Sequence, residues 1–206
     1  MDITEVKRRM HGGEIYDPSD PKLIFEQLSC LRRLKRFNRS GLIWRMLLAK
    51  KMFAEIGEKC YIEPPMYANW GCKHVHFGVG VYANFNLTLT DDTHIYVGNR
   101  TMFGPNVAVI TAAHPFDPAL RDKGLQYNKP VKIGRSVWIG ANAVILPGVT
   151  IGDNSVIGAG SLVTRDIPAN VVAYGSPCRV IRGITEADLN FYDKDKPLNG
   201  VDTEKF

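Results

Sequence analysis

The stretch IGANAVILPGVTIGDNSVIGAGSLV, residues 139–163, carries an aliphatic residue at every sixth position. The whole series is Ile133, Ile139, Ile145, Ile151, Ile157 and Val163. A period of six matches neither the alternation of a β-strand nor the 3.6-residue turn of an α-helix. It predicts a solenoid in which six residues form one short strand and one corner, so that about 18 residues close a coil.

An earlier segment shows the same step with two interruptions. Its apolar positions are Val75, Val81 and Leu87, then, after four extra residues around Thr90–Thr93, Val97, Phe103 and Val109. From about Thr111 to Pro130 the hexad positions hold Pro115, Arg121 and Tyr127, none of them aliphatic. We therefore expect the chain to leave the coil at residues 111–130 and to return at Val131. Long loops inside compact domains are uncommon and often functional.

The first 57 residues follow a helical period instead. Asp20 before Pro21 predicts a helix start, and Leu23, Leu28, Leu31 and Leu34 continue it to about Phe37. Ser40 is the expected cap of a second helix. Its expected apolar stripe is Ile43, Leu47, Leu48 and Phe53, with Arg45, Lys50 and Lys51 on the solvated side.

Three regions are therefore expected. Residues 1–57 form a helical region that packs on the solenoid, residues 58–183 form a β-helix with an extruded loop at 111–130, and residues 184–206 form a charged tail without an assigned role. A chain of 206 residues with 45% hydrophobic and 23% charged residues is long enough to bury a core.

Composition also limits the cellular setting. No window is apolar for the roughly 18 residues that a membrane span needs, and the start of the chain lacks the layout of a secretory signal. Cys30, Cys60, Cys72 and Cys178 form no CxxC pair, so we expect free thiols. The basic residues behind the net charge of +5 are interleaved with acids, so a smaller polyanion fits this charge as well as nucleic acid does. We expect no nucleic-acid partner. We expect a cytoplasmic protein without membrane contacts.

The motif from Ile139 to Arg182, together with YANFNLTLTDD at 82–92 and the N-terminal helices, resembles the hexapeptide-repeat acyltransferases. Within that family it is similar to the sugar O-acetyltransferase branch, which contains galactoside and maltose acetyltransferases. The resemblance covers residues 5–188 and implies a mostly β fold, a left-handed parallel β-helix. The left hand comes from the resemblance alone, because parallel crossovers are otherwise right-handed. A homotrimer with active sites between subunits is implied as well.

His114 stands where the repeat stops, at the start of the loop. From loop placement alone, such a histidine is either structural or catalytic. The resemblance implies that it is the general base, with acetyl-CoA as co-substrate, no metal, and a sugar hydroxyl, the 6-hydroxyl by expectation, as acceptor. An imidazole can take the hydroxyl proton at neutral pH and pass it to the departing thiolate. No GxSxG motif suggests an acyl-enzyme, so direct transfer in a ternary complex is expected.

The resemblance also implies two binding sets. Asn84 and Asp92 match positions that contact the sugar, with Asn69 and Asp17 as further acceptor candidates; turn formation is the alternative role of such residues. Gln126 occupies a place where many relatives have glutamate. The donor set is Thr164, Arg165, Arg179 and Arg182 for the phosphates, with Gly140, Ala141 and Ala159 leaving room for the pantetheine arm. Alternatively, the three arginines lie on the solvated surface and bind no ligand.

Three other functions stay open. The same coil carries γ-class carbonic anhydrases, which hold a metal with three histidines, and His74 and His76 form an HxH pair here. Their partners would have to come from His11, His94 and His114. An antibiotic alcohol, a serine and an amino sugar are the alternative acceptors for an acetyltransferase. A purely structural coil would leave the looped-out His114 unexplained.

Overall fold

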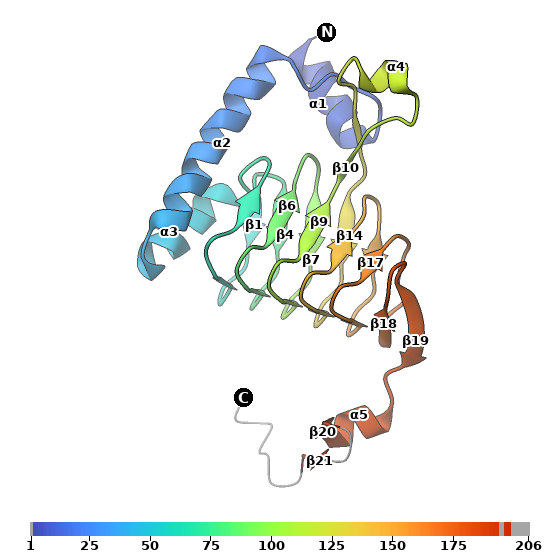
Figure 1. Cartoon of the computed structure of the whole chain (residues 1–206). Helices are drawn as coiled ribbons and strands as arrows, with labels where there is room; N and C mark the ends of the chain where they lie inside the picture. Colours follow the sequence, from blue (N-terminus) through green and yellow to red (C-terminus); the bar gives the residue numbers. More distant parts are fainter. Residues whose placement is uncertain (1, 194–195, 199–206) are drawn as a thin grey trace.

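The computed structural model describes residues 2–193 and 196–198, and it begins with three helices. These are α1 (Ile3–Gly12), α2 (Pro21–Arg39) and α3 (Leu42–Met52). A solenoid of short strands follows, and the chain leaves it for α5 (Glu186–Asn190) and the hairpin of β20 (Phe191–Asp193) and β21 (Lys196–Pro197). Figure 1 shows α1 and this C-terminal part at opposite sides of the solenoid. No described helix is long and apolar enough to cross a membrane.

Three sheets form the sides of the solenoid. Sheet 1 contains β1 (Glu55–Ile56), β4 (Val75–Phe77), β7 (Ile95–Val97), β12 (Val131–Ile133) and β15 (Thr150–Ile151). Sheet 2 contains β2 (Tyr61–Ile62), β5 (Tyr82–Ala83), β8 (Met102–Phe103), β13 (Trp138–Ile139), β16 (Val156–Ile157), β18 (Val171–Tyr174) and β19 (Arg179–Gly183). Sheet 3 contains β3 (Tyr67–Ala68), β6 (Thr88–Thr90), β9 (Ala108–Ile110), β14 (Val144–Ile145) and β17 (Leu162–Val163). Strands within each sheet pair in parallel, except β18 with β19.

The six-residue step explains the core. Ile139 pairs with Ile157 one coil further along, and Ile145 pairs with Val163. All four side chains are fully buried, so each stacks on its copy in the next coil and stays out of water along the whole axis. The predicted parallel solenoid is confirmed.

The first interruption of the repeat is shorter than the sequence indicated. Phe77, and not Val75, is the partner of Val97, while Val75 pairs with Ile95. Both positions point inward, because residues two apart on a strand share a face. The predicted insertion of four residues is therefore wrong. The inserted length is two residues, since the two partners are 20 positions apart where a regular coil needs about 18.

The structure agrees with the helix prediction for α2 and differs from it for α3. The Asp20 carboxylate accepts the Lys22 N–H at 2.8 Å, as expected for a cap. Ser40 does not cap α3; its hydroxyl donates to the Arg36 carbonyl at the end of α2. Half of the predicted apolar stripe is confirmed, because Phe53 is buried and Leu48 packs against the core. The other half is wrong, because Ile43 and Leu47 are exposed while Ala49 and Met52 are buried. With apolar residues around most of α3, periodicity could not select the buried face.

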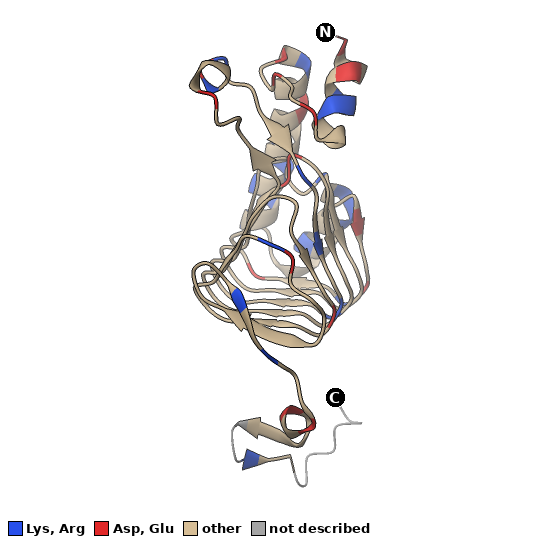
Figure 2. Cartoon of the chain, turned by 90° about the vertical axis from the view of Figure 1, so that its right-hand side faces the viewer, with Lys and Arg blue, Asp and Glu red and all other residues tan. Residues whose placement is uncertain are grey.

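The second interruption forms a hairpin outside the coil. Strands β10 (Ala112–Ala113) and β11 (Tyr127–Asn128) pair antiparallel, and the short helix α4 (Pro118–Arg121) lies between them. The chain enters this hairpin after β9 of sheet 3 and returns to the coil at β12 of sheet 1. In both views the hairpin and α1 project from the same side of the solenoid (Figures 1 and 2). The hairpin therefore extends from one corner of the triangular coil.

Candidate active site

His114 follows directly after β10, at the root of the hairpin, and its ring is exposed. Its Nδ1 lies 2.9 Å from the carbonyl oxygen of Leu125. A carbonyl can only accept, so the proton of this contact belongs to Nδ1 and the ring donates it. In the neutral ring, this leaves Nε2 unprotonated and able to take a proton from a bound group.

Asp92 and Asn69 meet at the same corner of the coil, where sheet 3 passes into sheet 1. Asp92 is buried, and its Oδ2 accepts the amide of Asn69 at 2.8 Å. Its Oδ1 accepts the amide of Gln126 at 3.3 Å. The structure thus brings two of the predicted acceptor residues together beside the root of the His114 hairpin. The Gln126 side chain contacts Asp92 and Tyr16, and no hydrogen bond joins it to the His114 ring.

Asp17 and Asn84 lie elsewhere. Asp17 is exposed, and its Oδ1 accepts the Ser19 N–H at 2.8 Å. The hydrogen bonds from Ser19 lower the pKa of this carboxyl group. Asn84 lies at the end of β5, where its Oδ1 accepts the neighbouring Phe85 N–H at 2.8 Å. Neither side chain has a hydrogen bond to Asp92 within the described residues.

Sequence reasoning missed two buried neighbours of these residues, Asp91 and Tyr16. The Asp91 Oδ1 accepts the Trp70 N–H at 2.6 Å, and its Oδ2 has no partner among the described residues. Burial raises the pKa of Asp91 to about 7. The Tyr16 hydroxyl contacts Gln126 and Asn128. Tyr16 lies in no recognisable motif. Asp91 belongs to the stretch YANFNLTLTDD, but nothing in that stretch distinguishes it from Asp92 as a buried carboxyl group.

A hollow of about 540 Å³ lies on sheet 2. Tyr82, Met102 and Trp138 contribute aromatic and aliphatic surface to it. Asn84 and three predicted donor residues, Gly140, Ala141 and Ala159, also line it. A Cβ atom on Gly140 would lie 2.5 Å from the backbone nitrogen of Ala159, so the coils can stack here only with glycine. The small residues leave an open strip along the sheet. His114 and Asp92 are not among the residues that line it.

The predicted cationic residues lie at the C-terminal end of the solenoid. Thr164 and Arg165 follow β17, whereas Arg179 and Arg182 lie on β19, and all four are exposed. Arg182 forms two hydrogen bonds with Asp188, at 2.6 and 2.8 Å, and this pairing raises the pKa of its guanidinium. Arg179 donates to the Cys178 carbonyl, and Arg165 has no hydrogen bond or ion pair within the described chain. Arg165 and Arg179 are thus open to a phosphate, while Arg182 already has a partner.

The other four histidines form a cluster under α1. The ring of His11 lies 4.8 Å from that of His74 and 5.0 Å from that of His94, and the His76 Nε2 lies 3.0 Å from the His94 Nδ1. Burial lowers the pKa of His11 to about 4 and that of His74 to about 3, so both rings are neutral at pH 7. Over residues 2–193 and 196–198, no group of three or more His, Cys, Asp or Glu is arranged to hold a metal ion.

Comparison with known proteins identifies the chain. Residues 130–165 match the model of the bacterial transferase hexapeptide, and residues 9–57 match that of the maltose acetyltransferase hexapeptide capping motif. A galactoside O-acetyltransferase of Lactococcus lactis is 57% identical over 97% of this chain and 98% of its own length. The chain belongs to the galactoside O-acetyltransferase family. Its hairpin and hollow are therefore features of an acyltransferase fold.

Solved structures of this family have the same fold. A galactoside acetyltransferase in complex with coenzyme A superimposes with a TM-score of 0.89 at 44% identity, covering 96% of this chain and 98% of that one. A maltose O-acetyltransferase from Clostridium difficile superimposes with a TM-score of 0.85 at 40% identity, covering 87% and 97%. The predicted fold class, a left-handed parallel β-helix with helical N-terminal region and extruded loop, is thereby confirmed.

Proposed function

We propose that this protein transfers an acetyl group from acetyl-CoA to a hydroxyl, by expectation the 6-hydroxyl, of a sugar or glycoside, with His114 as general base. The observation that carries the proposal is the His114 ring, held at Nδ1 by the Leu125 carbonyl with Nε2 left free. Family membership and the coenzyme A complex of a relative support the reaction class.

The proposed chemistry is a direct transfer. As the acceptor hydroxyl oxygen attacks the thioester carbonyl carbon, its proton passes to the His114 Nε2. The tetrahedral intermediate then expels the thiolate of coenzyme A, and the same Nε2 returns the proton to the sulfur. Throughout, the Leu125 carbonyl accepts the Nδ1 proton and stabilises the imidazolium that forms. No covalent acyl-enzyme is needed.

We assign the hollow on sheet 2 to the pantetheine arm of coenzyme A. The strip formed by Gly140, Ala141 and Ala159 lets a narrow chain lie against the coil, beside the apolar surface of Trp138. Thr164, Arg165 and Arg179 lie past the end of the strip, where cations suit phosphate groups. Arg182 would have to exchange Asp188 for a phosphate to take part.

The acceptor is proposed to bind at the corner of the coil beside the hairpin. Asp92 accepts hydrogen bonds, and Asn69 both donates and accepts, which suits sugar hydroxyls. Asp17 and Asn84 are proposed to complete the site when a neighbouring copy is present. Asp92 is rigidly placed, because both of its carboxylate oxygens already have partners.

A homotrimer is proposed for the working enzyme. Within one chain, His114 does not line the hollow. A donor bound there therefore needs the hairpin of another copy as the second wall of its site. Met102 and Trp138 expose about half of their surface at the hollow, which leaves apolar area for such a neighbour. Each active site would then combine the hollow of one copy with the hairpin of the next.

Thiol release from acetyl-CoA tests the reaction class and the base together. The acceptors are a galactoside, maltose, glucose, an amino sugar, chloramphenicol and serine, compared for wild type and His114→Ala. We expect sugar-dependent release that falls by a factor of about 10² to 10⁴ in the variant, the usual contribution of a general base. Phe116→Ala, a change of an exposed side chain in the same hairpin, is the matched control.

Binding measurements separate chemistry from folding. Calorimetric titration with coenzyme A should give nearly the same affinity for wild type and His114→Ala, because the residues assigned to the pantetheine arm, Gly140, Ala141 and Ala159, are unchanged in the variant. Sugar-dependent release that survives in His114→Ala would remove this residue as the base. Release with serine or chloramphenicol alone would place the acceptor outside the sugars.

A further inference from the structure

One peptide unit joins His114 to the N-terminal region. The carbonyl of Leu125, which accepts a hydrogen bond from the His114 Nδ1 at 2.9 Å, belongs to the same peptide as the N–H of Gln126. That N–H donates to the Tyr16 carbonyl at 3.1 Å, and the Tyr16 N–H donates to the Gln126 carbonyl at 2.9 Å. Because a peptide unit is planar, the partner of its N–H fixes the direction of its C=O.

We propose that Tyr16 is a positioning residue for His114, acting through the Leu125–Gln126 peptide. This inference rests on the proposed function, in which His114 is the base. Tyr16 does not touch the reacting groups. It fixes the carbonyl that holds the imidazole, and so keeps Nε2 aimed at the acceptor.

The Tyr16 side chain strengthens the same connection. Its hydroxyl is buried and accepts the side-chain amides of Gln126 and Asn128, the latter at 3.0 Å. The Asn128 amide also donates to the Met10 carbonyl near the end of α1, at 2.9 Å. Without the hydroxyl, both amides would lose an acceptor in a site that is closed to water. The two residues that Tyr16 holds lie one and three positions after Leu125.

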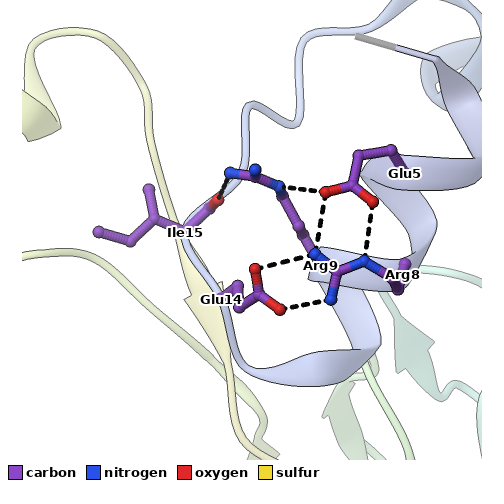
Figure 3. A network of polar contacts seen from close by, with 5 residues as sticks. All are labelled: Glu5, Arg8, Arg9, Glu14 and Ile15. Carbon is purple, nitrogen blue, oxygen red and sulfur yellow. Dashed lines mark hydrogen bonds and ion pairs between the residues drawn. The ribbon is translucent and has the colours of Figure 1, made fainter.

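Tyr16 can act as an anchor because its own segment is fixed. Figure 3 shows Arg8 of α1 between the carboxylates of Glu5 and Glu14, and Arg9 directed at the Ile15 carbonyl. The Tyr16 ring packs with Val6, Met10, Leu23 and Trp70 in a small core under the first two helices. Burial raises the pKa of Tyr16 to about 12, so the phenol stays neutral during turnover.

The hairpin has little else to hold it. Residues 115–125 include no buried side chain, and α4 is exposed. At the root of the hairpin, by contrast, Gln126 and Asn128 are buried against Tyr16. The direction of the His114 ring therefore depends on this contact, which gives the N-terminal region a role in the reaction.

Tyr16→Phe tests the inference, with Tyr127→Phe as matched control. Tyr127 lies in the hairpin that carries His114, and its hydroxyl has no hydrogen bond within the described residues. We expect Tyr16→Phe to lower kcat by about 10- to 100-fold, the cost of misplacing a catalytic group by a fraction of an ångström to about 1 Å. The KM for acetyl-CoA should stay unchanged, and Tyr127→Phe should behave as wild type.

The His114→Ala background shows whether Tyr16 acts through the histidine. There, adding Tyr16→Phe should leave the residual rate unchanged, because residues that work as a unit are not additive. An equal loss in both backgrounds, or full activity of Tyr16→Phe, would overturn the positioning role and leave the proposed function standing. Full activity of His114→Ala would overturn the proposed function itself.

A second substitution covers the case that Tyr16→Phe does not fold. Gln126→Met keeps the length of the side chain and removes its hydrogen bonds to Tyr16 and Asp92. Circular dichroism and coenzyme A titration identify the folded variants. Gln126→Met should show the same fall in kcat at constant KM for acetyl-CoA, again only when His114 is present; wild-type kcat in this variant would contradict the inference.

Discussion

Asp91 lies beneath the proposed acceptor site as a buried carboxyl group whose Oδ2 has no partner among the described residues. Burial raises its pKa from the usual 3.8 to about 7. At this group the folded state therefore binds more protons than the unfolded state between about pH 4 and 7, so the contribution of Asp91 to wild-type stability falls as the pH rises through this window and levels off above it.

Asp91→Asn should remove this dependence. The amide keeps an acceptor for the Trp70 N–H and carries no charge at any pH. We expect the difference in unfolding temperature, variant minus wild type, to increase by at least about 2 °C from pH 5 to pH 7.5. Scanning fluorimetry at fixed protein concentration measures it. Parallel pH curves for the two proteins would show that Asp91 does not titrate in this range.

The site residues differ in how well the sequence could reveal them. Asp92 stands in a break of the repeat, whereas Asn69 was indicated by the resemblance alone, and the structure joins the two by a hydrogen bond. Gln126, at a place where many relatives have glutamate, is linked to the His114 ring only through the Leu125 carbonyl of the peptide that Leu125 and Gln126 share. Tyr16 meets the hairpin 110 positions away in the chain, and no local pattern encodes such a contact.

At the scale of elements, the stacked aliphatic ladder should carry the stability. Ile145 is fully buried between Val109 and Val163, whereas Ile43 on α3 exposes 74% of its surface. Ile145→Ala should lower the free energy of unfolding by about 2–5 kcal/mol. Ile43→Ala, the same deletion on the surface, should change it by no more than about 0.5 kcal/mol. Urea titration at one protein concentration compares them; equal losses would contradict the ladder as the main source of stability.

The same contrast explains what the sequence could predict about the elements. The solenoid could be predicted from its period, because Ile145 meets an aliphatic residue at the matching position of each adjacent coil, Val109 on one side and Val163 on the other. The buried face of α3 could not be predicted in this way, because Ile43, Leu47 and Ala49 are all apolar. Only the packing of α3 on the coil determines that Ala49 is buried. The hairpin after Thr111 was expected from missing aliphatic residues, but its antiparallel pairing and α4 depend on contacts beyond that pattern.

At the scale of the whole molecule, three distant parts of the chain serve one proposed reaction. The N-terminal segment fixes the root of the hairpin, the hairpin carries His114, and sheet 2 provides the hollow. Within one chain, the hollow is lined without the histidine. The proposed reaction therefore requires that the hairpin of one copy completes the hollow of another.

Mixed oligomers test this central claim most directly. His114→Ala removes the base, and Ala159→Trp fills the hollow at an exposed position. Each variant alone should be inactive in thiol release from acetyl-CoA with a galactoside. When the two are co-expressed at equal levels, half of the hairpins keep His114 and half of the hollows stay open, so about one quarter of the sites in a closed ring pair the two. We predict recovery of about one quarter of wild-type activity. Folded mixed oligomers that stay inactive would contradict an active site shared between copies.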